Sequence, residues 1–157
     1  MKTLDYVHLD SKKTEKTVTG LQELLANLQV YYTNLRGFHW NVKGVEFFGA
    51  HAKLEEFYDD AAAKADEVAE RILMLGGVPA HNFSEYLKLS SIKESAVVSH
   101  TKEIMKLVLD NLKILIGLER KVLETASEGD DEGTVALMSD FISGQEKTVW
   151  MLTAFLS

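Results

Sequence analysis

Two pairs of metal-binding side chain types occur on one predicted helix. His51 and Glu55 are four residues apart, and Asp66 and Glu70 repeat the same spacing. Side chains four residues apart project from neighbouring turns on one face of a helix, so each pair can hold an ion. The pattern indicates a cation site in which imidazole nitrogen and carboxylate oxygen act together.

The two pairs cannot meet within one copy of this helix. Glu55 and Asp66 are separated by about 16 Å along the axis, at 1.5 Å per residue. Two antiparallel copies related by a two-fold axis would place Glu55 opposite the partner subunit's Asp66, and His51 opposite the partner subunit's Glu70. A symmetric interface of this kind generates two identical sites. We therefore predict a dimer whose sites are shared between chains.

A helical wheel at about 100° per residue separates three faces of this helix. The apolar face is expected to pack in the core, and a face of mixed charge is expected to meet solvent. The third face, beside the core face, carries His51, Glu55, Asp59, Ala62, Asp66 and Glu70. The alanines at positions 61–63 lie at the midpoint of the predicted helix pair, where small side chains permit close approach.

His39 offers a third ligand from the same chain. It lies at the end of the preceding helical stretch or just beyond it, and the short segment WNVKG lets the chain turn back before His51. Two imidazoles and three carboxylates suit ferrous iron, manganese or zinc. Redox-active iron with room for an oxidant would give ferroxidase chemistry. His8, His81 and His100 are interpreted as ordinary surface or structural groups.

Composition and length narrow the class of protein. The 157 residues fit a single domain, residues 1–157, that is long enough to bury a core. The absence of cysteine excludes disulfides and thiolate metal sites. The net charge of −7 argues against a general nucleic-acid binder. Since neither a secretory signal nor an apolar run of membrane-spanning length is visible, we expect a cytoplasmic protein.

Helical periodicity predicts an all-α fold. Apolar residues recur at helical spacing in four long stretches, and no alternating strand pattern is present. The expected helices cover residues 13–38, 49–75, 92–125 and 131 onward, and the segment NFSEYLKLS adds a short helical turn between the second and third. Four long helices with one long middle connection predict a four-helix bundle with a crossover.

Three segments, FHWNVKG, FFGAHAKLEEFY and DEVAERILMLGGVP, resemble the core motif of Dps-type miniferritins. The last helix is similar as well, so the resemblance covers most of the chain. It implies a ferritin-like four-helix bundle whose long crossover carries a short extra helix, assembled as a hollow dodecamer. It also implies that Fe²⁺ is oxidised, preferably by hydrogen peroxide, and stored as ferric mineral, which protects the cell from oxidative damage.

The resemblance also assigns roles to individual residues. The implied ferroxidase centre takes ligands from two subunits: His39, His51 and Glu55 from one, and Asp66 and Glu70 from its neighbour. Trp40, beside the centre, would intercept radicals formed during iron oxidation; a plain packing role is the alternative. Glu55 departs from the family pattern, which more often has aspartate, so the carboxylate stands one methylene further out.

The acidic segment EGDDEG, residues 128–133, has two interpretations. Asp130 or Asp131 can cap the last helix, whose positive end favours acidic residues. The resemblance adds a pore through which iron enters at a three-fold axis, lined by acidic residues from the set Glu128, Asp130 and Asp131.

Two other functions compete with iron oxidation. Many members of the family bind and compact DNA through a lysine-rich terminal extension. Here the N-terminal lysines are offset by acids: Lys2, Lys12, Lys13 and Lys16 against Asp5, Asp10 and Glu15. Acidic subunits would repel DNA phosphates, so we expect weak or absent DNA binding. The second alternative is an assembly bridged by zinc that does no redox chemistry.

Overall fold

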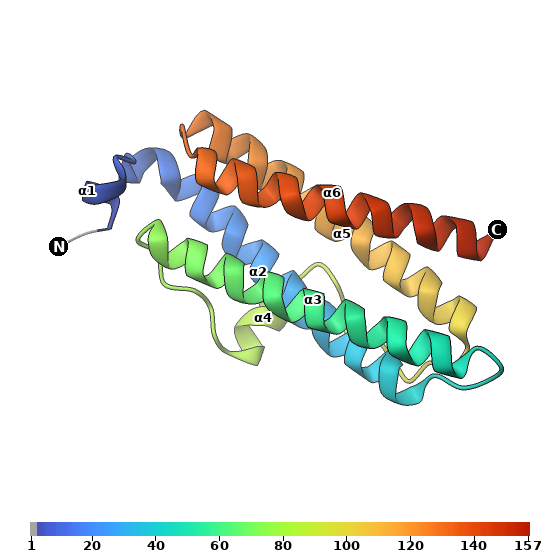
Figure 1. The fold of residues 1–157 in the computed structure, drawn as a ribbon. Helices are drawn as coiled ribbons and strands as arrows, with labels where there is room; N and C mark the ends of the chain where they lie inside the picture. The colour runs from blue at the N-terminus through green and yellow to red at the C-terminus, as the bar shows by residue number, and fades with distance from the viewer. Residues whose placement is uncertain (1–2) are drawn as a thin grey trace.

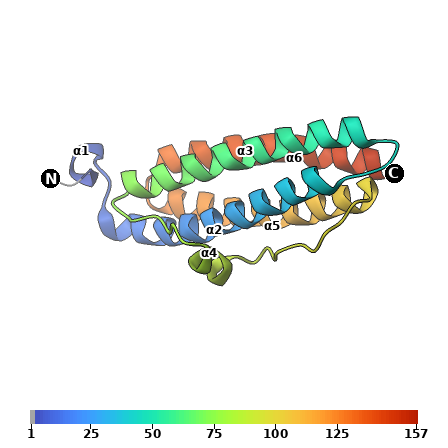
Figure 2. The ribbon, with the colours of Figure 1, turned by 90° about the horizontal axis from the view of Figure 1, so that it is seen from below.

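Four long helices make the body of the fold, and two short helices accompany them. The computed structural model describes residues 3–157, which form α1 (Leu4–Val7), α2 (Ser11–Asn41), α3 (Phe47–Met74), α4 (Phe83–Leu89), α5 (Thr101–Glu128) and α6 (Glu132–Leu156). Figure 2 shows α3 and α6 in one layer and α2 and α5 in the other, with α4 outside α2. The predicted all-α bundle is confirmed.

The crossover between α3 and α5 runs the length of the bundle. Figure 1 shows that α2 and α6 point one way along the bundle, while α3 and α5 point the other way. Because α3 and α5 are parallel, the chain must travel back from the end of α3 before α5 can begin. The predicted short helix, α4, lies within this crossover and packs on α2. Among residues 3–157 there is no helix whose length and apolar content suffice to cross a membrane.

The start of the predicted third helix is wrong. That helix was expected from residue 92, but α5 begins only at Thr101. Asn27 of α2 accepts hydrogen bonds from the backbone N–H groups of Ser91 and Ile92, at 3.0 and 2.9 Å. Asn34, two turns further along α2, donates a hydrogen bond to the backbone oxygen of Lys93 and accepts one from the backbone N–H of Ser95. These side-chain amides satisfy backbone groups that a helix would otherwise pair, so the segment stays extended.

Local signals set the other helix ends. The Asp10 carboxylate accepts hydrogen bonds from the backbone N–H groups of Lys12 and Lys13, at 2.7 and 3.3 Å, and so caps α2. Gly76, just past α3, has φ of +81°, a conformation that glycine adopts without strain. Apart from the start of α5, each predicted boundary lies within three residues of the observed one.

One ionisable side chain is fully buried in the apolar core. Glu119 of α5 has no exposed surface. Its Oε1 accepts a hydrogen bond from Nε2 of Gln145 on α6, whereas Glu119 Oε2 and Gln145 Oε1 have no hydrogen-bond partner. Burial disfavours the charged carboxylate and raises the pKa of Glu119 to about 7.

The Glu119 pKa predicts a pH-dependent stability. The folded-state pKa of Glu119, about 7, lies above the usual value of 4.5. Between these two pH values the folded chain holds the proton and the unfolded chain does not. The free energy of unfolding therefore falls as pH rises from 4.5 to about 7. We expect Glu119→Gln, which cannot ionise, to remove that loss and to raise the free energy of unfolding at pH 8 by about 2 to 3 kcal/mol. Urea unfolding at pH 5 and pH 8 measures the difference.

The matched control is Glu124→Gln, which neutralises an exposed carboxylate on the same helix. It should keep the wild-type pH dependence. A Glu119→Gln variant whose stability changes with pH as steeply as that of the wild type would contradict the prediction.

Candidate metal centre

The imidazoles of His39 and His51 lie against each other where α2 turns into α3. Residues 42–46 are the whole connection between the two helices, so the helix ends are held close together. The two rings are stacked with their centroids 3.7 Å apart and their planes at 20°. His39 is buried and His51 is half-buried. His39 is thus part of α2, near its end.

Reciprocal hydrogen bonds determine which nitrogen of each ring is free. Nδ1 of His39 lies 2.8 Å from the backbone oxygen of His51, and Nδ1 of His51 lies 2.9 Å from the backbone oxygen of His39. A carbonyl oxygen only accepts, so each Nδ1 carries the hydrogen and donates it. In the neutral rings each Nε2 then holds a lone pair, the arrangement typical of metal-binding histidines. Two nitrogen ligands are therefore prepared by the protein alone.

Aromatic rings surround the two imidazoles. Phe47 stacks on His51 with a centroid distance of 5.0 Å, and Tyr58 meets His39 edge to face at 5.3 Å. Neither ring was predicted to lie at the site, although the helical repeat contains a signal for one of them, because Phe47 lies one turn before His51. These rings restrict the orientation of the imidazoles and shield one side of the pair from water.

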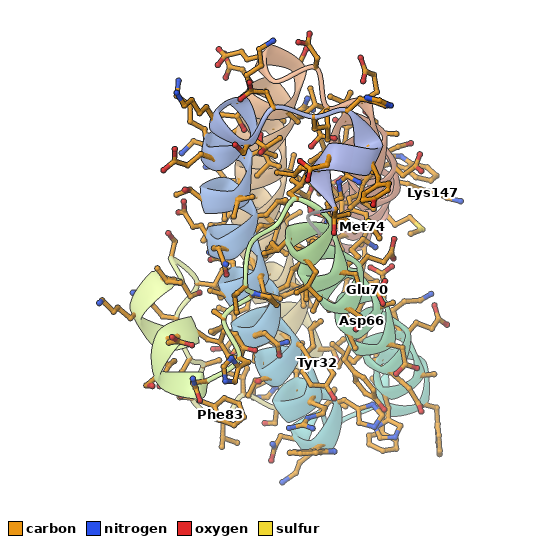
Figure 3. All side chains as sticks on the ribbon, turned by 90° about the vertical axis from the view of Figure 1, so that its left-hand side faces the viewer. Tyr32, Asp66, Glu70, Met74, Phe83 and Lys147 are labelled. Carbon is orange, nitrogen blue, oxygen red and sulfur yellow. The ribbon has the colours of Figure 1, made fainter. Side chains whose placement is uncertain are left out.

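Tyr58 stays protonated beside the imidazoles. Burial raises the pKa of its phenol, and the negative charges of Glu55 and Asp59 raise it further. Tyr32 of α2 packs edge to face on Tyr58 with a centroid distance of 6.1 Å. Figure 3 shows Tyr32 on α2, next to the α3 face that carries Asp66 and Glu70.

The carboxylates of the third face are exposed, as the helical wheel predicts. Glu55 follows His51 by one turn, and Asp66 and Glu70 lie further along the exposed surface of α3. Figure 3 shows Asp66, Glu70 and Met74 in succession along this helix. Within the described chain, no ion pair engages Asp66 or Glu70. Both carboxylates are thus available to an ion.

The ligand candidates form two separate groups in one chain. Within residues 3–157, no three histidine, aspartate or glutamate side chains converge closely enough to hold a metal ion. We call His39, His51 and Glu55 the imidazole half-site, and Asp66 with Glu70 the carboxylate half-site. The structure brings the two histidines together and leaves the carboxylate half-site apart from them.

Two expectations for the other faces of α3 need correction. Ala61 is buried in its own bundle, so only the exposed alanines at 62 and 63 can approach a partner. The face of mixed charge does not simply meet solvent. Lys64 covers the Phe141 ring of α6 at 5.2 Å, and Arg71 pairs with the buried carboxylate of Asp131. The helical wheel could not include α6, which packs against this face.

The acidic segment before α6 serves mainly as a helix cap. Asp131 is buried, caps α6 through the backbone N–H of Thr134, and is paired with Arg71. Its carboxylate therefore has no exposed surface with which to line a pore. Glu128 and Asp130 are exposed, and Asp130 lies 2.6 Å from the ammonium of Lys13. The pore interpretation is thereby limited to Glu128 and Asp130.

Trp40 points away from the core of its own chain. It is 66% exposed, and the Arg36 guanidinium lies 5.0 Å from the centre of its ring. Within the described chain Trp40 is therefore not a core residue, and its role stays a prediction.

Comparison with known proteins identifies the family of the fold. The ferritin-like domain family matches residues 18–157. A DNA protection during starvation protein of Porphyromonas gingivalis is 52% identical over 154 residues, covering 98% of this chain and 97% of the relative. The crystal structure of a Dps protein from Vibrio cholerae O1, described as a member of the ferritin-like diiron-carboxylate superfamily, matches with a TM-score of 0.93 and 50% identity, covering 95% of this chain and 94% of that one.

A second crystal structure, of a Dps protein from Bacillus brevis, matches with a TM-score of 0.90 and 36% identity, covering 95% of this chain and all of that one. The chain belongs to the ferritin-like family. Within that family its relatives are Dps proteins, and the resemblance recognised in its motifs is confirmed.

The fixed imidazole orientation predicts the effect of removing one ring. We expect His51→Ala to weaken Co²⁺ binding by roughly 10-fold to 100-fold, because the variant loses one ligand nitrogen and the ring that stacks on His39. Titration followed by visible absorption of the bound cobalt measures the affinity. His81→Ala, which removes an exposed histidine outside the half-site, serves as the control. Equal cobalt affinities for the two variants would contradict the assignment.

Proposed function

We propose that this protein oxidises Fe²⁺ with hydrogen peroxide at centres shared between two chains, and that it stores the ferric product inside a hollow assembly. The observation that carries this proposal is the reciprocal hydrogen bonding of His39 and His51. It leaves two Nε2 atoms with free lone pairs. The carboxylates needed to complete an iron site lie too far along the same helix to reach them.

A second copy supplies the missing carboxylates. In the antiparallel two-fold arrangement, the partner's Asp66 and the partner's Glu70 approach the imidazole half-site, and the reciprocal contacts build a second centre. The resulting set of two nitrogens and three carboxylates has intermediate hardness, which suits ferrous iron and also admits zinc or manganese as substitutes. Carboxylates further favour the ferric product because they offset its higher charge.

The reaction balances with peroxide as the oxidant. Two ferrous ions give up one electron each, and one hydrogen peroxide accepts both electrons and two protons to leave as two water molecules. Because both electrons go to one peroxide molecule, no hydroxyl radical is released. His39, His51 and the three carboxylates bind the iron substrate, and exposed Trp40 beside the centre intercepts radicals that do arise.

The proposal also includes the oligomeric state of the protein and its location in the cell. We assign the chain to a dodecamer built from two-fold dimers in the cytoplasm, with Glu128 and Asp130 at the pore where iron enters. An acidic shell raises the local concentration of cations. The relatives are named for DNA protection, and removal of Fe²⁺ and peroxide protects DNA without any contact with it.

Iron oxidation after anaerobic loading tests the proposed function. We expect added peroxide to raise ferric absorbance rapidly, with two irons oxidised per peroxide. Asp66→Ala/Glu70→Ala should lower the initial rate at least ~100-fold, because it removes one of the two half-sites from every centre. Glu56→Ala/Glu67→Ala removes the same charge from α3 outside the third face and should keep the wild-type rate.

An initial rate in the wild type no faster than in a protein-free solution would contradict the proposal. So would an unchanged rate in Asp66→Ala/Glu70→Ala. Binding of Zn²⁺ without any peroxide-dependent iron oxidation would favour the zinc-bridged alternative instead.

DNA binding is expected to be weak. The exposed N-terminal lysines at positions 12 and 16 are few, and Lys13 is already paired with Asp130. We expect no gel shift of linear duplex DNA with the assembled protein at about 150 mM salt, where phosphate contacts are screened. A tight shift that persists at higher salt would contradict this expectation.

A further inference from the structure

A cavity of about 230 Å³ lies between α3 and α6, which lie in the same layer of the bundle (Figure 2). The residues of α3 that line it are on the face opposite to the ligand candidates. Its lining includes the exposed Glu56, and also Leu28 of α2 and Leu115 of α5, which have no exposed surface. The cavity therefore reaches from the surface into the core of the bundle.

Gln145 of α6 connects this cavity to Glu119 of α5. Gln145 lines the cavity and is 4% exposed, and its Nε2 donates a hydrogen bond to Oε1 of the fully buried Glu119. Within the described chain, the second oxygen of each side chain, Glu119 Oε2 and Gln145 Oε1, has no hydrogen-bond partner. A buried polar atom without a partner is costly, so two such oxygens beside a cavity indicate a ligand that donates hydrogen bonds.

The charges that line the cavity are already balanced. Two ammonium groups meet two carboxylates on α3, in the ion pairs Lys53–Glu56 and Lys64–Asp60. An added cation would be repelled by the lysines and an added anion by the acids, so a neutral ligand suits the cavity best. Water is neutral and donates two hydrogen bonds. Each molecule takes up about 30 Å³ in the liquid, so the cavity has room for several.

We propose that the cavity is a hydrated proton-binding site, in which water molecules bridge the free oxygens of Glu119 and Gln145 and carry a proton between the Glu119 carboxyl group and solvent. Each chain thus holds in its core one proton that follows the pH of the surrounding solution. The site is separate from the proposed iron chemistry, because none of its lining residues belongs to the imidazole half-site or the carboxylate half-site.

The groups around Glu119 allow it to bind a proton near neutral pH. Burial is the main reason that the pKa of Glu119 is raised to about 7. The hydrogen bond from Gln145 and the charge of Lys64 on α3 lower this pKa, whereas the charge of Asp60 raises it. Arg120, on the same helix as Glu119, lowers it by a smaller amount. Glu119 is therefore neutral in mild acid and ionised in mild base.

Tyr31 is the titratable residue that α2 contributes to the cavity lining. It is 5% exposed, and burial and the charge of Asp60 raise the pKa of its phenol. The hydroxyl group therefore stays protonated and neutral when Glu119 changes its charge. A phenol can donate and accept hydrogen bonds, so Tyr31 is a further partner for water in the cavity.

Gly144 gives access to the cavity from α6. It lines the cavity and is exposed, and no heavy atom lies within 4 Å of the position that its Cβ would occupy. Glycine is unfavourable inside a helix, and here it leaves open the space that a larger side chain would fill. A leucine at this position therefore tests whether the cavity is the route to Glu119.

Infrared spectroscopy of the assembled protein measures the proton directly. A protonated carboxylic acid has a carbonyl stretch that ionised carboxylates lack, and the difference between the wild type and Glu119→Gln isolates the contribution of Glu119. We expect this band to disappear as pH rises through about 7. After transfer of the protonated form to D₂O, the band should show deuterium uptake within the mixing time, because water reaches the carboxyl group.

Two variants that fill the cavity test the route. Gly144→Leu should slow deuterium uptake by Glu119 at least ~10-fold, because the leucine displaces water. Thr148→Leu, which changes another lining residue one turn further along α6, should act in the same direction. Gly117→Leu is the matched control, since Gly117 is exposed on α5, also has open space around its Cβ position and does not line the cavity. It should exchange as fast as the wild type.

Three results would overturn the inference. Slow deuterium uptake in the wild type would show a dry pair, in which protonated Glu119 donates its hydrogen bond directly to Gln145. Fast uptake in both folded filling variants would show that the proton takes another route. The lack of a Glu119 band in mildly acidic solution would show that the group does not bind a proton there. None of these measurements depends on iron oxidation, so the proposed function can fail or stand independently.

Discussion

Each of the two histidines at the α2–α3 turn donates a hydrogen bond to the backbone carbonyl of the other, and the rest of the site depends on this exchange. It ties the last turn of α2 to the first turn of α3. It fixes the hydrogen on both Nδ1 atoms and leaves both Nε2 atoms free. The hydrogen bonds that join the two helices therefore also leave two nitrogen atoms free to bind a metal ion.

The rise of the α-helix then separates the imidazole half-site at this turn from the carboxylate half-site. Asp66 and Glu70 lie about 16 Å or more beyond Glu55, at 1.5 Å per residue, and a straight helix cannot shorten that distance. In our account, chemistry is consequently coupled to assembly. Under the proposed function, a free chain lacks a complete centre, and iron oxidation requires a partner and the assembly that receives the ferric product.

Local signals allowed much of the fold to be predicted from the sequence. Helical periodicity located the four long helices, Asp131 was one of two predicted caps, and the helical wheel found the exposed face that carries Glu55, Asp66 and Glu70. The errors arose where contacts with elements distant in the sequence determine the local backbone structure. The segment after residue 90 is held extended by Asn27 and Asn34, which precede it by about 60 residues in the chain.

The remaining differences have the same origin. Arg71 faces the buried carboxylate of Asp131, which caps α6, and Glu119 of α5 is buried against Gln145 of α6. Neither environment can be derived from a wheel of one helix. The exchange of hydrogen bonds between His39 and His51 was likewise invisible, because side-chain spacing says nothing about backbone carbonyls. The residue types of the site could be predicted, but the orientation of its two rings could not.

Subunit mixing tests the central claim most directly. Chains with His39→Ala/His51→Ala and chains with Asp66→Ala/Glu70→Ala are each expected to be inactive on their own. A mixed dimer contains one of each chain. One of its two centres then has all its ligands, and the other has neither half-site intact. After unfolding and refolding of an equal mixture, random pairing gives mixed dimers in about half of the cases. We therefore predict recovery of roughly a quarter of the wild-type rate of peroxide-driven iron oxidation. No recovery in particles that native mass spectrometry shows to contain both chains would contradict a centre shared across the two-fold axis.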